Sequence, residues 1–201
     1  MLYISTMRAT LGLLLALSIL MCSKFSSCFA QERANSEISP AQLQDALNST
    51  NGAVRFRLAE KLSLYHSEAT FSALLKLLTD KNVDISYAAA ESIEARKDNA
   101  FDRQLIATIE TLPRNNRWPS YRAAKNYSTQ GMLIFLQQRL DEEIEFQHKR
   151  NAFDSENCFY LAQSLEQIAR NLQMPVKLAA PEGDSLVAYE AFAKQFKNLQ
   201  K

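Results

Sequence analysis

Residues 74–93 read LLKLLTDKNVDISYAAAESI, and this stretch decides the fold expected for the chain. Its first part is rich in leucine and ends at Asp80, and its second part follows Asn82 and runs through small residues. Apolar residues at spacings of three and four are typical of an amphipathic helix, and alanine has the highest helix propensity of all residues. An asparagine before such a run is a favoured N-cap. The stretch therefore predicts two helices joined by a short turn.

The same pattern recurs when the chain is shifted by 31 residues. In the first helix of each unit the corresponding residues are Leu43, Leu74 and Leu105; Leu47, Leu78 and Ile109; and Ile38, Ala69 and Ala100. In the second helix Asn51, Val54, Ala59 and Leu62 correspond to Asn82, Ile85, Ala90 and Ile93, and a third copy follows 34 residues later as Asn116, Ala124 and Tyr127. We therefore predict three helix–turn–helix units in residues 38–130, with an asparagine cap on each second helix. Ser39-Pro40-Ala41-Gln42 predicts a capping box at the start of the first.

These units resemble HEAT-type repeats. The resemblance is carried by residues 74–80 with 82–93, and by Gly52-Ala53-Val54-Arg55 followed by Leu58-Ala59 and Leu62. Two positions depart from the family pattern, because Ser86 replaces a basic residue and Pro119-Ser120 replaces a Val-Arg pair. The glycine and aromatic positions of tetratricopeptide repeats are missing. The resemblance implies an all-α fold, an α-solenoid of stacked antiparallel helix pairs in which the second helices, called helices B, line one surface.

The C-terminal region, residues 131–201, predicts capping helices for this stack, because terminal repeats need an atypical end. Residues 131–146 place Met132, Leu136, Leu140 and Ile144 on one face of a helix, and residues 156–172 do so with Leu161, Leu165, Ile168 and Leu172. After a loop with Pro175, Pro181 and Gly183, Asp184 is the expected cap of a last helix with Tyr189, Phe192, Phe196 and Leu199.

Residues 1–30 have the pattern of a secretory signal peptide, with cleavage expected after Ala30 and a short linker at residues 31–37. Arg8 precedes an apolar run of about twelve residues, whereas a membrane-spanning helix needs about 20. An uncleaved anchor is the second interpretation, and a lipoprotein acylated at Cys22 is the third. The predicted location is therefore secreted or periplasmic, without membrane insertion after cleavage.

Charge and cysteine content exclude several classes of protein. The 201 residues include 23 basic and 22 acidic side chains, so the net charge of +1 gives no field that would attract nucleic acid. Removal of Arg8 and Lys24 with the signal peptide would leave 21 basic and 22 acidic side chains and a net charge of −1. Cys158 would then be the only cysteine, which excludes an internal disulfide, and we expect it to be a buried thiol.

No motif for catalysis, cofactor binding or metal binding is found. Four scattered glycines cannot form a phosphate loop, and one cysteine with two histidines gives no zinc spacing. His66 is expected in a turn beside a helix cap. The acidic run Asp141-Glu142-Glu143 with Glu145 is followed by Lys149 and Arg150, which predicts a solvated helix face with intrahelical ion pairs.

The candidate site is therefore a surface. Arginine and tyrosine are typical anchors of interfaces, and six residues of these kinds or lysine fall on the helices B: Arg55, Arg57, Tyr87, Tyr121, Arg122 and Lys125. We expect a scaffold that binds a protein or peptide partner along this face. The alternative is a ligand carrier or enzyme with a site between the repeats and the C-terminal helices, and its candidate residues are His66, His148, Tyr121 and the carboxylates near Glu142.

Overall fold

The computed structural model describes residues 38–150, 155–175, 179–181 and 185–199. The predicted signal peptide and linker, and the predicted cap Asp184, lie outside these residues. The chain divides into two units, one ending at Gln42 and the other beginning at Leu43. The described residues form helices and no strand, so the predicted all-α class is confirmed. None of the helices in this part of the chain combines the length and the apolar character that a bilayer crossing requires.

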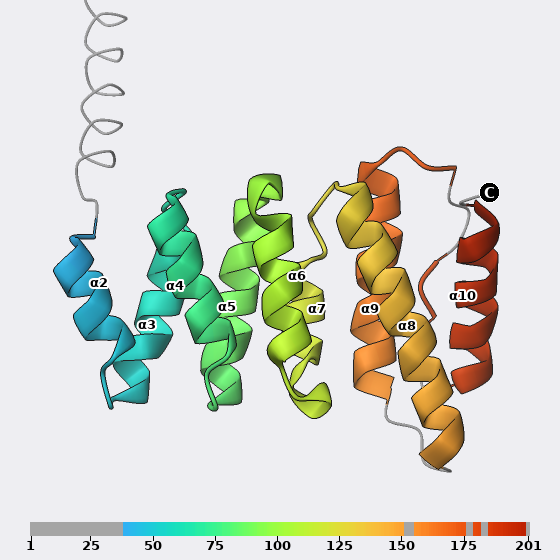
Figure 1. Ribbon diagram of the computed structural model, residues 1–201, viewed down its shortest axis with the longest axis horizontal. Helices are drawn as coiled ribbons and strands as arrows, with labels where there is room; N and C mark the ends of the chain where they lie inside the picture. Colours follow the sequence, from blue (N-terminus) through green and yellow to red (C-terminus); the bar gives the residue numbers. More distant parts are fainter. Residues whose placement is uncertain (1–37, 151–154, 176–178, 182–184, 200–201) are drawn as a thin grey trace, which may run out of the picture. The chain divides into compact units, whose positions relative to one another are not determined.

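Nine α-helices and two short 3₁₀ helices account for the described secondary structure (Figure 1). They are α2 (Pro40–Leu47), α3 (Gly52–Leu62), α4 (Glu68–Leu78), α5 (Val83–Arg96), η1 (Asn99–Phe101), α6 (Asp102–Thr111), η2 (Arg114–Asn116), α7 (Trp118–Ala123), α8 (Gln130–Arg150), α9 (Ser155–Asn171) and α10 (Leu186–Leu199).

The helices from α3 onward pack in two layers. Helix α3 contacts α5, α5 contacts α7, and α7 contacts α9, so these four form one layer, which we call the helix-B layer. Helices α4, α6 and α8 lie beside them in the second layer, where α6 packs against α8. Ala59, Ala89, Ala90, Ala123 and Ala124 are all fully buried, and such small side chains let neighbouring helices approach closely.

The predicted core positions of the second helices are buried in all three units, but those of the third unit lie beyond its helix, because α7 ends at Ala123. The first set is Ala59, Ala90 and Ala124 and the second is Leu62, Ile93 and Tyr127, and every one of these side chains is 0% exposed. Leu43, Leu74 and Leu105 are also buried in the first helices. Other matched positions do not belong to the core in every unit. Val54 is exposed whereas Ile85 is buried, and Ala69 and Ala100 match each other but are both exposed.

Two of the three predicted asparagine caps are confirmed. Asn51 Oδ1 accepts from the N–H of Ala53, and Asn82 Oδ1 accepts from the N–H of Asp84, each at 2.9 Å. The prediction for Asn116 is wrong, because this residue ends η2 and the residue before α7 is Arg117, which makes no side-chain cap. Pro119 in the first turn of α7 has no N–H to donate, which removes part of the need for a cap.

The predicted capping box before α2 is confirmed within residues 38–42. The N–H of Gln42 donates to Ser39 Oγ at 3.2 Å, and the N–H of Ser39 donates to Gln42 Oε1 at 3.3 Å. The helix accordingly begins at Pro40, as a proline at the first helical position predicts.

The C-terminal region forms the three predicted helices, and α8 is longer than expected. Helices α8 and α9 pack against each other, and α10 contacts both of them. Their predicted apolar faces are largely buried, because Met132, Leu136, Leu140, Leu161, Leu165, Ile168, Tyr189 and Phe196 are all 0% exposed. Ile144 and Leu172 are only half-buried.

Candidate interaction surface

A groove of about 560 Å³ lies between α3 and α5 on the outer side of the helix-B layer. The apolar residues that line it are Ala53, Phe56, Ile85, Tyr87 and Ala88. Its charged residues are Arg57 on the α3 side and Asp84 and Glu91 on the α5 side. Grooves of this size, apolar with a few charged groups, suit a peptide or a small molecule.

Aromatic side chains continue from this groove across α5, α7 and α9. The ring centroids of Tyr87 and Trp118 are 5.5 Å apart, and those of Trp118 and Tyr160 are 5.2 Å apart in a stacked arrangement. Phe159 meets Tyr160 edge-on at 5.3 Å. We call Phe56, Tyr87, Trp118, Phe159 and Tyr160 the aromatic strip; all five side chains are half-buried, so their outer edges remain accessible.

Arg122 holds the strip in place between α5 and α7. Its guanidinium carbon lies 4.4 Å from the centre of the Tyr87 ring, and its nitrogens pair with Glu91 at 2.9 Å and Glu94 at 3.0 Å. Burial raises the pKa of Glu94; the positive charge of Lys125 opposes that rise, and the negative charge of Glu91 adds to it. Arg122 thus already contacts three residues of the protein: Tyr87, Glu91 and Glu94.

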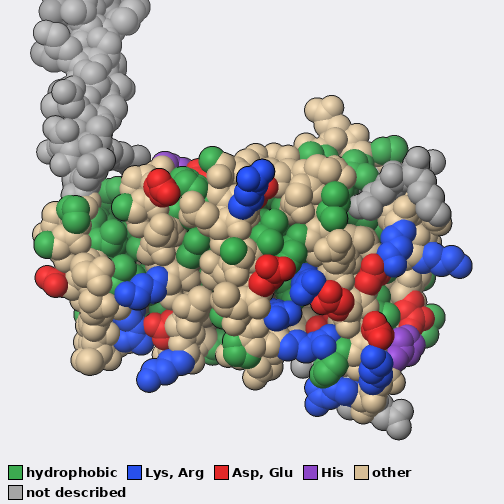
Figure 2. All heavy atoms as spheres, in the orientation of Figure 1, with side chains coloured by type: hydrophobic (Ala, Val, Ile, Leu, Met, Phe, Trp, Pro, Cys, Tyr) green, Lys and Arg blue, Asp and Glu red, His purple; other side chains and the backbone are tan. Residues whose placement is uncertain are grey.

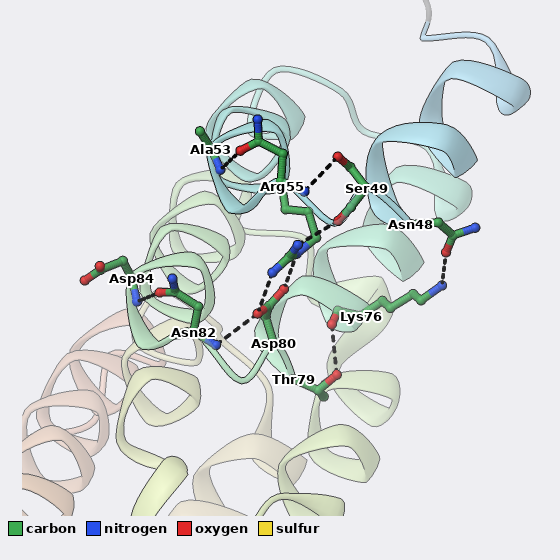
Figure 3. A network of polar contacts seen from close by, with 10 residues as sticks. Asn48, Ser49, Ala53, Arg55, Lys76, Thr79, Asp80, Asn82 and Asp84 are labelled. Atoms are coloured by element: carbon green, nitrogen blue, oxygen red, sulfur yellow. Dashed lines mark hydrogen bonds and ion pairs between the residues drawn. The ribbon is translucent and has the colours of Figure 1, made fainter.

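Arg55 is similarly engaged, in a polar network at the turn between α4 and α5 (Figure 3). Its Nε donates to Asp80 at 2.6 Å, and a second nitrogen donates to the carbonyl of Ser49 at 2.7 Å. The same Asp80 carboxylate accepts from the N–H of Asn82 at 2.9 Å. Although burial raises the pKa of Asp80, the hydrogen bonds from Arg55 and Asn82 outweigh it and hold the pKa below its ordinary value. This network links the first helix pair to the second.

The remaining predicted residues have different surroundings. Arg57 is exposed in the first groove, and Lys125 lines a second groove of about 290 Å³ beside Phe159. Tyr121 does not lie on the expected surface, because it is 2% exposed beneath α9, where Ser164 Oγ donates to its backbone carbonyl. Burial raises the pKa of the Tyr121 hydroxyl to about 12. The structure therefore brings Arg57, Tyr87, Arg122 and Lys125 to the outer side of the helix-B layer, and Arg57 alone of these is largely exposed.

Four residues of the strip are absent from the sequence-based prediction: Phe56, Trp118, Phe159 and Tyr160. The 31-residue shift could have found two of them, since it carries Phe56 to Tyr87 and Tyr87 to Trp118. The prediction matched the third unit at a shift of 34, which carries Tyr87 to the buried Tyr121 instead. Phe159 and Tyr160 have no such signal, because α9 lies beyond the three predicted units.

The residues named for a ligand or enzyme site come together only in part, because Tyr121 lies near enough to Glu143 for that carboxylate to add to the rise that burial causes in the Tyr121 pKa. His66 is exposed in the turn before Ser67, the N-cap of α4, as predicted, with Nδ1 3.1 Å from Asp98. His148 pairs with Glu190, which joins α8 to α10. The two histidines therefore contact different elements, His66 beside Asp98 between α5 and η1 and His148 beside Glu190 of α10, and Tyr121 is buried where α7 packs against α9.

The acidic run of α8 is partly as predicted. Glu145 pairs with Lys149 at 2.7 Å and Glu142 with Arg139 at 2.6 Å, so these intrahelical ion pairs are confirmed. Glu143 was expected on the solvated face, but it is 3% exposed and contacts Arg114 of η2 at 2.9 Å.

Glu143 is the centre of a buried polar cluster between η2, α8 and α9. Gln147 donates to it at 2.7 Å, and Asn157 Nδ2 lies 3.4 Å from it and donates to the carbonyl of Arg114 at 3.2 Å. Cys158 beside Asn157 is 0% exposed, which confirms the expected buried thiol. The described residues contain no cluster of side chains suited to holding a metal ion.

The opposite side of the molecule has a different character. Figure 2 shows the face over α4, α6 and α8, where Lys and Arg side chains lie among Asp and Glu. A shallow groove between α4 and α6 is lined by Leu75, Lys76, Ala107 and threonines, without an aromatic residue. The aromatic strip is therefore a feature of the helix-B side.

No known protein family, curated protein or solved structure matches the chain.

Proposed function

We propose that the chain is an α-solenoid of HEAT-like repeats, closed by its C-terminal helices, that binds a protein or peptide partner along the helix-B side. The repeat architecture is supported by the core positions that recur in all three units and by the successive contacts of α3, α5, α7 and α9. Solenoids of this kind offer extended binding surfaces, since each unit contacts only its neighbours.

The observation that carries the proposal is the aromatic strip. Large aromatic side chains at a surface are enriched at the centres of interfaces, where a few of them supply most of the binding energy. Tyr87 and Trp118 are already ordered by their ring contact, by the stacking of Trp118 on Tyr160 and by Arg122, so a partner that contacts them does not have to immobilise them. Half-buried aromatic residues on α5, α7 and α9, which are neighbours in the helix-B layer, thus form a rigid and partly apolar surface.

The proposed location is outside the cytoplasm, in a secretory or periplasmic compartment. This part of the proposal is supported by the signal-like pattern of residues 1–30. It is tested by mass spectrometry of the protein recovered from its host, where a first residue Gln31 is expected. Recovery of the protein with residues 1–30 still attached would contradict this location.

The binding proposal is tested by quantitative affinity capture from the native host with the full chain and its variants. Tyr87→Ala and Tyr160→Ala remove rings from the strip, and each is expected to weaken capture of the specific partner at least about tenfold. Ile134→Ala is the matched control, because Ile134 is an apolar side chain of α8 that is 44% exposed on the other layer. It is expected to capture the partner as the wild type does.

Folding must be separated from binding in these variants. The circular dichroism and thermal unfolding of each variant identify any that has lost its structure, and Arg57→Glu then serves as a replacement, because Arg57 is exposed. If wild type, strip variants and Ile134→Ala capture the same proteins equally, the helix-B side is not the binding surface.

A further inference from the structure

We propose that the groove between α3 and α5 binds a proline-rich segment in the polyproline II conformation, with an acidic and a basic side chain three residues apart. This inference rests on the proposed function and specifies the partner's chemistry. It is argued from the lining of the groove, from two charged residues that form no ion pair with any residue the structure describes, and from the separation of the two helices.

The apolar lining of the groove suits proline. Phe56 and Tyr87 supply aromatic rings, and Ala53 and Ala88 leave room between them. Aromatic-lined grooves are the usual docking sites of proline-rich segments, whose polyproline II helix is already formed before binding. Gly52 at the end of the groove has no side chain either. A Cβ at this position would lie 3.7 Å from Ile85, in the space that the glycine leaves open.

Two opposite charges on opposite walls of the groove are left for a ligand. Arg57 and Asp84 are exposed, and neither makes an ion pair with another residue of the described part of the chain. Figure 3 shows the Asp84 side chain extending away from the network around Asp80. The other arginines of this side are occupied, since Arg55 pairs with Asp80 and Arg122 with Glu91 and Glu94.

The spacing of these charges sets the spacing in the ligand. Packed helices lie roughly 8–10 Å apart, and Arg57 corresponds to a position one turn further along than Asp84, an axial offset of about 6 Å. Together these place the two residues about 11 Å apart. Side chains three residues apart in a polyproline II helix point the same way and are separated by about 9 Å. Long acidic and basic side chains make up the difference.

The inference is tested with three fluorescent peptides and the full chain, by fluorescence anisotropy. The peptides are PPEPLKPP, PPEPLEPP and PPKPLKPP, which differ only in the two charged positions. The wild type is expected to bind the peptide of mixed charge about fivefold more tightly than either of the others, an effect that salt weakens. Because the mixed peptide can bind in either direction, the comparison does not depend on peptide polarity.

Charge changes in the groove should redirect this preference. Arg57→Glu makes both walls acidic and is expected to bind PPKPLKPP best. Asp84→Lys places a basic residue on each wall, where Glu91 is already paired with Arg122, and is expected to bind PPEPLEPP best. Arg103→Glu, a surface arginine of α6, is the control and should keep the wild-type order. Unchanged order in the groove variants, or no binding of any peptide, overturns the inference. The capture experiment with Tyr87→Ala decides the proposed function separately, because it does not depend on these peptides.

Discussion

The turns of the second and third predicted units have similar sequence patterns, but their side chains make different contacts. In the second unit, the turn from Thr79 to Asn82 caps α5 through Asn82 and binds the preceding unit through Asp80 and Arg55. In the third unit, the turn from Leu112 to Arg117 contains η2, leaves α7 without a side-chain cap, and directs Arg114 forward to Glu143 of α8. The contacts of these turns thus differ: Asp80 joins its turn to the preceding helix pair, whereas Arg114 joins its turn to the following helix α8.

This comparison predicts the largest effect on stability for the contact between Arg114 and Glu143, which links the third turn forward to α8. Glu143→Ala is expected to lower the free energy of unfolding by about 3 kcal/mol, because it leaves Arg114, Gln147 and Asn157 without their buried acceptor. The measurement is urea unfolding followed by circular dichroism. Glu142→Ala, next to it in sequence, removes a carboxylate that is 53% exposed and should change the stability by less than about 0.5 kcal/mol. Equal effects of the two variants would show that Glu143 is not a buried link.

A smaller difference is expected between the two asparagines. Asn82→Ala removes the cap of α5 and should cost about 1 kcal/mol of stability. Asn116→Ala should change the free energy of unfolding by less than about 0.5 kcal/mol, because Asn116 is exposed and caps no helix. Chemical denaturation of both variants checks this. A loss of similar size in the two would mean that the turns of the second and third units are equivalent.

The contact between Asp80 and Arg55, which links the second turn back to the preceding helix pair, predicts a dependence of stability on pH. Because the pKa of Asp80 is lower in the folded chain than when unfolded, its contribution is present above the unfolded pKa of about 3.9 and is lost as the pH falls through the folded pKa. Thermal unfolding of wild type and Asp80→Asn between pH 6 and pH 3 measures it. The gap between their melting temperatures should narrow toward pH 3, and a constant gap would contradict the account.

The helices and their buried faces could be predicted because they depend on local spacing and caps. Positions such as Ala90 and Ile93 repeat with the period of the unit, and Ser39 and Asn82 act on neighbouring backbone N–H groups. Asn116 was mistaken for a cap because the sequence pattern does not show the 3₁₀ turn that precedes α7.

The site could be predicted only in part because it depends on contacts between units. Sequence spacing placed Tyr87 on the correct helix side but did not separate the surface residue Trp118 from the buried Tyr121, three residues later. Nor does it show that Arg55 is bound to a carboxylate of the α4–α5 turn and Arg122 to carboxylates of α5, 25 to 31 residues away in sequence.

The most direct test of the helix-B side as a binding surface is photo-cross-linking in the native host. A photoreactive amino acid replaces Arg57 in one full-length protein and Arg103 in another, and both positions are exposed, on opposite layers. After irradiation, we expect a discrete cross-linked partner from position 57 and none from position 103. The same partner cross-linked equally from both positions, or from position 103 alone, would contradict the account.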